Sequence, residues 1–347
     1  MIRSLAASLS LCVLAVPSAL PAAPADGRGA STIRIAACRH VDSLAWSNDG
    51  RLMAAVARNA EDKVSLHIWR DGVEQRSLPL ASGLYQALFA PRGTLLALVD
   101  RSDRMNGIQL VDAADGSAKR ELETGWPISA VAFAPDGTRL AASPIGPETG
   151  IWLWDTRSWR RERIALGTQL GTYQQSLDFL PGGLLAITYA GANVGLWDIR
   201  TWQLRRRLSA RDGLSSDVMG GPAAVTSDGR WLALAYTPLP PVPTFLPYPW
   251  RIRVWDLRSG ATAGELHPAR DMELLAFRPA SAVLAAQFVG DEGALQLFEP
   301  GSWKQQQAFS WTGGLDTLAF SPAGDLAFAG PAAGKTCAVE IRPVPAR

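Results

Sequence analysis

Few residues of this 347-residue chain have a type and spacing suited to chemistry. Histidine, a common general base and metal ligand, occurs three times, at His40, His67 and His267. Zinc sites hold their cysteine and histidine ligands a few residues apart, and we find no cysteine or carboxylate partner for these histidines at ligand spacing. His67 lies in the apolar run Leu66–Trp69, which favours a packed strand residue. The sequence therefore predicts no metal site and no cofactor.

Other catalytic motifs are also missing. The chain has no phosphate-binding loop, dinucleotide fingerprint or G-x-S-x-G turn. The segment Gly213–Asp217 is predicted to be a loop. Asp100 and Asp103 resemble half of a calcium loop, but the loop's glycine and glutamate are absent, which favours a solvated turn. No catalytic residue is predicted, although a site assembled from distant loops would leave no linear pattern.

The elements that would position any site are repeats. A strand that ends in a Pro/Asp/Gly-type turn recurs seven times, and the ladder-breaking residues of that turn favour a hairpin. The key apolar residues of the copies are 43 to 52 residues apart, close to the ~40–45 of one propeller blade; they are Trp46, Phe89, Phe133, Phe179, Val225, Phe277 and Phe320.

A second landmark keeps step with the first. Each copy is followed by a β-type run that ends in a Trp-Asp pair or a degraded form of it: Trp154-Asp155, Trp197-Asp198 and Trp255-Asp256 are intact, and Trp69-Arg70, Val111-Asp112, Phe298-Glu299 and Ile341-Arg342 are degraded. Through these residues the chain resembles divergent bacterial members of the WD40-repeat family. The Gly-His found before many WD40 blades is absent from nearly all copies, so specific functions of that family are not carried over.

The resemblance implies an all-β, seven-bladed β-propeller over residues 26–347, with four antiparallel strands in each blade. The blades are expected to start near residues 41, 84, 128, 173, 221, 272 and 315. The last repeat ends at its third strand, so we expect the segment Thr32–Ala37 to pair with Thr336–Ile341 and close the ring, as in WD40 propellers.

This closure brings Cys38 and Cys337 into one blade. A disulfide between them is the prediction, since exported proteins meet an oxidising compartment. Directly opposite and diagonal positions of the two cysteines are both compatible with the sequence. Two unbridged packing residues are the alternative.

The first residues indicate export. Arg3 is followed by an apolar run from Leu5 to Val16 and by small residues at 23–25, as in a signal peptide. We expect residues 1–25 to be removed, no membrane insertion of the mature chain, and a periplasmic or secreted location. With 34 Lys and Arg against 32 Asp and Glu, nothing indicates a nucleic-acid partner. We expect a monomer.

Loop length suggests where a partner binds. The distance from the first turn to the Trp-Asp position is 14 to 19 residues in six blades, but 26 in the fifth, from Gly229 to Trp255. The additional residues form a proline-rich segment, residues 237–250. This segment and the long link that precedes blade five, residues 210–221, are expected on one rim. The candidate partner-binding residues, expected to be at least partly exposed, are Phe245, Leu246, Tyr248, Trp250, Leu214 and Met219.

We therefore predict an exported scaffold that binds a protein or peptide. An inert lid is the structural alternative for the loop, since exposed loops also tolerate insertions. An exported propeller enzyme, a hydrolase or oxidoreductase with a site at the central channel mouth, is the functional alternative; inward-facing ionisable side chains with shifted pKa values would favour it.

Overall fold

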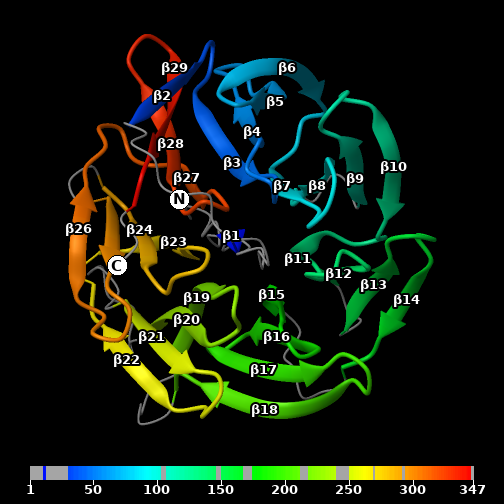
Figure 1. Ribbon diagram of the computed structural model, residues 1–347, viewed down its shortest axis with the longest axis vertical. Helices are drawn as coiled ribbons and strands as arrows, with labels where there is room; N and C mark the ends of the chain where they lie inside the picture. Colours follow the sequence, from blue (N-terminus) through cyan, green and yellow to red (C-terminus); the bar gives the residue numbers. More distant parts are fainter. Residues whose placement is uncertain are drawn as a thin grey trace, which may run out of the picture.

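Seven small antiparallel sheets form a ring around a common centre, the arrangement of a seven-bladed β-propeller (Figure 1). The computed structural model describes residues 11–12, 30–102, 107–145, 150–166, 174–211, 218–239, 250–268, 270–290 and 294–344. Every regular element in these ranges is a strand. The fold class predicted from the repeats is therefore confirmed.

The strands of the first four blades run from the centre of the ring outward. Blade one contains β3 (His40–Trp46), β4 (Leu52–Arg58), β5 (Val64–Arg70) and β6 (Val73–Leu80). Blade two contains β7 (Tyr85–Phe89), β8 (Leu95–Asp100), β9 (Gly107–Asp112) and β10 (Ala118–Glu123). Blade three contains β11 (Ile128–Phe133), β12 (Arg139–Pro144), β13 (Ile151–Asp155) and β14 (Arg161–Ile164). Blade four contains β15 (Gln174–Leu180), β16 (Leu184–Tyr189), β17 (Asn193–Asp198) and β18 (Gln203–Ser209).

The remaining blades follow the same order. Blade five contains β19 (Val218–Val225), β20 (Trp231–Pro238), β21 (Arg251–Asp256) and β22 (Thr262–Leu266). Blade six contains β23 (Met272–Phe277), β24 (Leu284–Phe288), β25 (Leu295–Phe298) and β26 (Gln305–Phe309). Blade seven contains β27 (Thr317–Phe320), β28 (Leu326–Ala332), β29 (Thr336–Arg342) and, as its outer strand, β2 (Ser31–Ile35). The two-residue β1 (Leu11–Cys12), inside the segment predicted to be removed, pairs in parallel with β23 at the centre of the ring.

The Trp-Asp landmark has a local cause. At the end of β13, Asp155 Oδ1 accepts hydrogen bonds from the backbone N–H groups of Arg157 (3.2 Å) and Ser158 (2.7 Å). Asp198 and Asp256 do the same in blades four and five. The carboxylate thus satisfies backbone donors in the turn to the fourth strand, as aspartate does in many turns.

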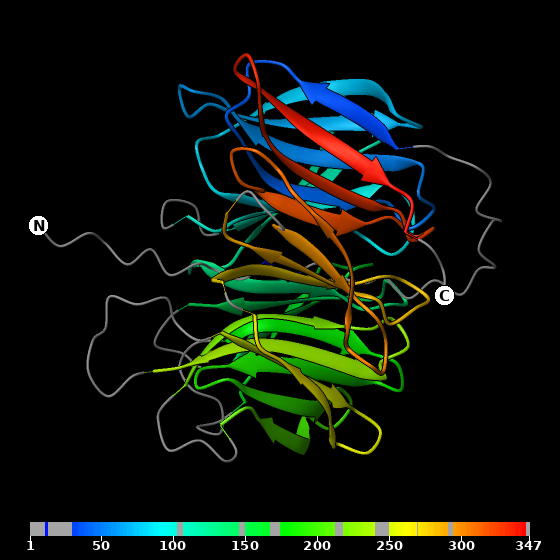
Figure 2. The same cartoon turned by 90° about the vertical axis from the view of Figure 1, so that its left-hand side faces the viewer.

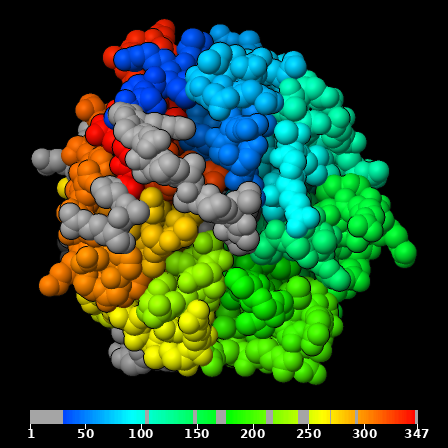
Figure 3. Space-filling model, viewed as in Figure 1, coloured from blue at the N-terminus to red at the C-terminus, as the bar shows by residue number. Residues whose placement is uncertain are grey.

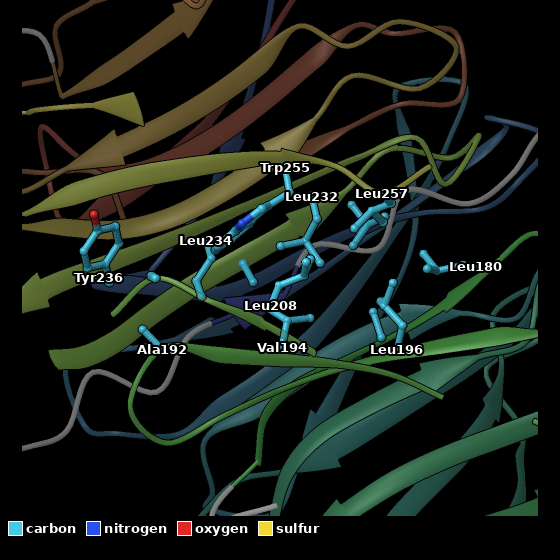
Figure 4. Close-up of a cluster of buried hydrophobic side chains, with 14 of the residues drawn as sticks. Leu180, Ala192, Val194, Leu196, Leu208, Leu232, Leu234, Tyr236, Trp255 and Leu257 are labelled. Carbon is cyan, nitrogen blue, oxygen red and sulfur yellow. The ribbon is translucent and has the colours of Figure 1, made fainter. Parts of the chain in front are cut away.

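The core lies between neighbouring blades. Figure 4 shows the cluster between blades four and five, which contains Leu196 of β17 together with Leu232 and Trp255 of blade five. The second strand of each blade carries an alanine at the equivalent position. Each of these alanines is at most 1% exposed, and their small side chains let neighbouring sheets approach closely; they are Ala54, Ala97, Ala141, Ala186, Ala233, Ala285 and Ala327. The outer strands are polar, as the largely exposed β10 illustrates.

The ring closes as the sequence predicts. β2 pairs antiparallel with β29, from Ser31 opposite Ile341 to Ile35 opposite Cys337. The space-filling view places the blue N-terminal strand against the red last blade (Figure 3). The strand ends at Ile35, two residues earlier than expected.

A disulfide joins Cys38 to Cys337, with a Cα–Cα distance of 5.2 Å. Cys38 is neither directly opposite nor diagonal to Cys337 in the strand ladder, because Ile35 occupies the opposing position. Instead, a turn with a left-handed Ala37 (φ 49°) returns the chain toward β29, where the N–H of Cys38 donates to Lys335 O. The Cα separation lies within the ~4.4–6.8 Å range of disulfides.

Candidate functional site

The two edges of the ring carry different connections. We call the edge with the links between consecutive blades and between second and third strands the linker rim; residues 81–84 and 124–127 belong to it. The opposite edge, the hairpin rim, carries the turns after the first and third strands, such as residues 47–51 and 71–72. Both edges are seen from the side in Figure 2.

The first strands present polar side chains at the linker rim. In five blades the register between first and second strands shifts near the start of the first strand, as at Val41/Ser43 and Met272/Leu274. Such a bulge turns the extra residue out of the ladder. In blades one and six the extra residue is acidic, Asp42 and Glu273, and Asp316 directly precedes the first strand of blade seven.

These three carboxylates belong to a charged group that we call the seam cluster: His40, Asp42, Arg58, Glu273, Gln287 and Asp316. His40 Nδ1 lies 2.5 Å from Asp316 Oδ1, and its Nε2 lies 3.6 Å from Asp42 Oδ1. The N–H of Val41 donates to the second oxygen of Asp316 at 2.9 Å. One imidazole therefore bridges carboxylates of blades seven and one, directly beside the disulfide.

Arg58 and Gln287 hold the other two carboxylates. Arg58 Nη2 donates to Asp42 Oδ2 (2.8 Å) and to the carbonyl of Gly83 in blade two (2.6 Å). Gln287 Nε2 donates to Glu273 Oε2 (2.7 Å) and to the carbonyl of Leu315 in blade seven (2.8 Å). The cluster thus connects blades six, seven, one and two along the linker rim.

The cluster shifts the pKa values of its members. The hydrogen bond to Asp316 raises the pKa of His40, against the opposing effect of burial. Burial raises the pKa of the Asp42 carboxyl, although Arg58 opposes the shift. Burial also raises the pKa of Glu273, and the neighbouring charge of Asp316 adds to it. Shifted ionisable groups of this kind mark functional sites more often than average surface.

One sequence prediction is wrong here, and one contact was not anticipated. The sequence analysis considered carboxylates only at metal-ligand spacing, whereas His40 contacts Asp42 and Asp316, the latter 276 residues away in the chain. Asp100 was expected in a solvated turn, but it ends β8 and is 2% exposed. Its Oδ1 accepts the backbone N–H groups of Leu84 and Ser102, so its role is structural. Asp103 lies outside the described residues.

The partner-binding candidates fare unevenly. Met219, the second residue of β19, is 41% exposed at the linker rim. Trp250 is 7% exposed and packs in the core between blades five and six, which corrects the expectation that it is presented to a partner. Its ring lies on the backbone of Gly221, where an added Cβ would stand 2.5 Å from Cζ3. Leu214, Phe245, Leu246 and Tyr248 lie outside the described residues.

Exposed apolar side chains gather on the same rim. Of the five large apolar residues that are exposed in the described ranges, Leu84, Trp126, Met219 and Val289 lie at the linker rim. The fifth, Val73, lies at the hairpin rim. Leu84 and Val289 lie one and two residues after Gly83 and Gln287, whose hydrogen bonds belong to the seam cluster. The rim therefore combines charge with exposed apolar surface.

Metal-binding geometry is not found in the described residues: no group of three or more His, Cys, Asp or Glu side chains there could hold an ion. His67 contacts Ser65 and Glu74 of its own blade.

An open groove of about 610 Å³ lies on the outer side of blades five and six, between His267 and Trp303, and does not include the seam cluster. Within the described residues, no helix is long and apolar enough to cross a membrane.

No protein-family model matches the chain, and no curated protein sequence matches it.

A first prediction concerns pH. Since the folded-state pKa of His40 is raised, its stabilising effect is complete below the unfolded value of 6.5 and is lost as pH rises through the folded value. The His40→Asn variant, which cannot titrate, should lose this pH-dependent contribution. The difference should stay below about 1 kcal/mol, because the imidazole is 44% exposed and solvent screens it.

Urea unfolding of both proteins at pH 5.5 and at pH 9 measures this effect. The gap in unfolding free energy between wild type and variant should shrink at the higher pH. A constant gap would contradict the bridging role of His40. Both proteins keep Asp42, Asp316 and Arg58 around position 40, so the comparison isolates the loss of the imidazole.

Proposed function

We propose that this protein is an exported, WD40-like interaction scaffold that binds a protein or peptide through its linker rim. The β-propeller fold is consistent with such a scaffold. The observation that carries the proposal is the placement of Leu84, Trp126, Met219 and Val289 at one rim, the rim that also holds the seam cluster. Tryptophan and methionine are enriched in protein interfaces relative to the rest of the surface.

Two features support export. The first 25 residues have the pattern of a signal peptide. The Cys38–Cys337 disulfide is of a kind that persists in oxidising compartments and is rare in reducing ones. Both features favour a periplasmic or secreted location.

The proposal predicts that substitutions at the linker rim weaken partner binding and that substitutions at the hairpin rim do not. Replacing Trp126 and Met219 by alanine should weaken partner binding by about tenfold or more, because exposed aromatic and apolar anchors carry most interface energy. Capture from an envelope fraction with immobilised mature protein identifies the partner, and titration of the purified partner then gives the Kd. Photo-crosslinkers at positions 126 and 219 should join the same protein.

Val73→Ala is the matched control, since Val73 is exposed on the opposite rim. It should leave the Kd unchanged. Equal affinity of the double variant and the control, or the absence of crosslinks from positions 126 and 219, would contradict binding at the linker rim.

A second candidate, an enzyme acting at the centre of the ring, is favoured by one observation. Asp316 orients the imidazole of His40, as carboxylates do for histidine bases. However, a carboxylate, Asp42, faces the other imidazole nitrogen where a nucleophile's hydroxyl or thiol would stand. The arrangement therefore supports binding better than covalent catalysis.

A further inference from the structure

The seam cluster contains more negative than positive charge. It has three carboxylates, Asp42, Glu273 and Asp316, and one permanent cation, Arg58. Arg58 is already engaged by Asp42 and the Gly83 carbonyl, and His40 is engaged by Asp316 and Asp42. Glu273 is left without an ion-pair partner among the described residues. One carboxylate of the cluster thus lacks a cation.

Gln287 provides an independent observation at the same place. Its side chain is completely buried, and Nε2 uses both hydrogens, one on Glu273 and one on the Leu315 carbonyl. Its Oε1 is buried and has no hydrogen-bond partner in the described part of the protein. Rotating the amide would not help, because both current partners are acceptors. The amide therefore holds the Glu273 carboxylate, while its own buried oxygen has no donor among the described residues.

A second buried acceptor lies nearby in the cluster. Asp42 Oδ1 makes no hydrogen bond in the described residues, and His40 Nε2 lies 3.6 Å from it. Buried polar atoms without partners cost free energy and are uncommon in folded proteins. Both atoms are buried acceptors that a partner cannot reach directly, whereas the half-buried Glu273 remains accessible to a donor.

The surroundings define which donor fits. The described acidic and histidine side chains form no group able to hold a metal ion, so an organic cation with several N–H donors is favoured. Val289, two residues after Gln287, is 50% exposed. An apolar surface next to a carboxylate matches the long methylene stem and charged end of arginine or lysine.

We propose that Glu273, held by Gln287 at the linker rim between blades six and seven, binds the guanidinium or ammonium group of an arginine or lysine side chain of the partner. This inference rests on the proposed function, since it names the chemistry of the partner. The raised pKa of Glu273 is consistent with it, because burial and the neighbouring Asp316 charge disfavour the ionised carboxylate more than the Gln287 hydrogen bond and the charge of His40 favour it.

The test uses a small probe instead of the unidentified partner. N-acetyl-arginine methylamide is titrated into the mature protein, with the neutral, nearly isosteric citrulline analogue as the comparison, and binding is followed by NMR chemical shifts. We expect saturable binding of the arginine probe and binding of the citrulline probe at least about tenfold weaker. A charged hydrogen bond of ordinary strength accounts for that factor.

Glu273→Gln should weaken binding of the arginine probe by about tenfold or more, while Glu273→Asp should retain part of it. Glu61→Gln is the matched control: it removes the same charge from an exposed glutamate of the linker rim that is paired with Lys63. Its Kd should stay within about twofold of wild type. Equal unfolding midpoints in urea show that Glu273→Gln is folded.

Three results would overturn the inference: no saturable binding of the arginine probe to wild type, equal binding of the two probes, or an unchanged Kd in Glu273→Gln. These outcomes are separable from failure of the scaffold function. If Trp126 and Met219 are needed for the partner while Glu273 is dispensable for the probe, the rim function stands and the cation site falls. If the probe needs Glu273 while the partner ignores the rim, the reverse holds.

Discussion

Removing the Cys38–Cys337 disulfide is expected to lower the free energy of unfolding by about 4–5 kcal/mol. The two residues are 299 positions apart, so the bridge closes a loop of nearly the whole chain, and the entropy removed from the unfolded state grows with loop length. The double variant Cys38→Ser, Cys337→Ser should therefore unfold at much lower denaturant concentration than the oxidised protein.

Reductant supplies the control for this prediction. Dithiothreitol should bring the wild type to the stability of the double variant and should leave the double variant unchanged. Mass spectrometry of mature protein alkylated without reduction should find no free thiol at either position. Two alkylated cysteines, or a stability loss below about 1 kcal/mol, would mean that hydrogen bonds and packing alone close the ring.

Trp250→Ala is expected to cost about 3–5 kcal/mol, the range for truncating a large buried aromatic side chain. Trp250 is 7% exposed and packs between blades five and six. Gly221→Ala should also destabilise the protein, because the added Cβ would stand 2.5 Å from the rigid indole ring. Chemical denaturation of the two single variants measures both effects.

Met219→Ala is the matched control for Trp250→Ala, since Met219 is 41% exposed and lies only two residues before Gly221. Its unfolding free energy should change by less than about 0.5 kcal/mol, as surface substitutions usually do. If Trp250→Ala instead left stability unchanged and weakened partner binding, the indole would have to be presented to the partner after all.

The fold could be predicted from the sequence because each blade repeats the same local sequence signals. The Pro/Asp/Gly-type turn ends the first strand, and the aspartate of the Trp-Asp pair satisfies the donors of the next turn, as Asp155 does. Both signals lie within a few residues of the structure that they determine. Ring closure could be predicted by counting strands, since the last repeat has only three and the N-terminal segment supplies the fourth.

The seam cluster could not be found in the same way. Its carboxylates come from blades one, six and seven, and only the closed ring makes these blades neighbours. A signal was nevertheless present: the fourth residue before the key apolar residue is acidic in these three blades alone, as Asp42, Glu273 and Asp316. Aligning the repeats by column, instead of searching for motifs along the chain, would have exposed it.

The errors over Trp250 and Asp100 have a shared physical origin. Both residues border loops, and proline-rich or charged neighbours suggested that they are exposed. Burial at the end of a strand is decided by the adjacent blade, which composition does not describe. Gly221, which makes room for the indole, lies 29 residues before Trp250 in the chain.

The closed seam also determines how tension would pass through the molecule. The chain enters β2 at Ser31 and leaves β29 after Ile341, and these two residues face each other at the same end of the pair. Pulling the two chain segments apart would therefore unzip the hydrogen bonds of β2 one after another instead of shearing them together. The disulfide lies at the far end of the pair, beyond Ile35. Peeling would stop there, and the load would pass from one strand to the other through a covalent bond, leaving the remaining blades outside the path of the force.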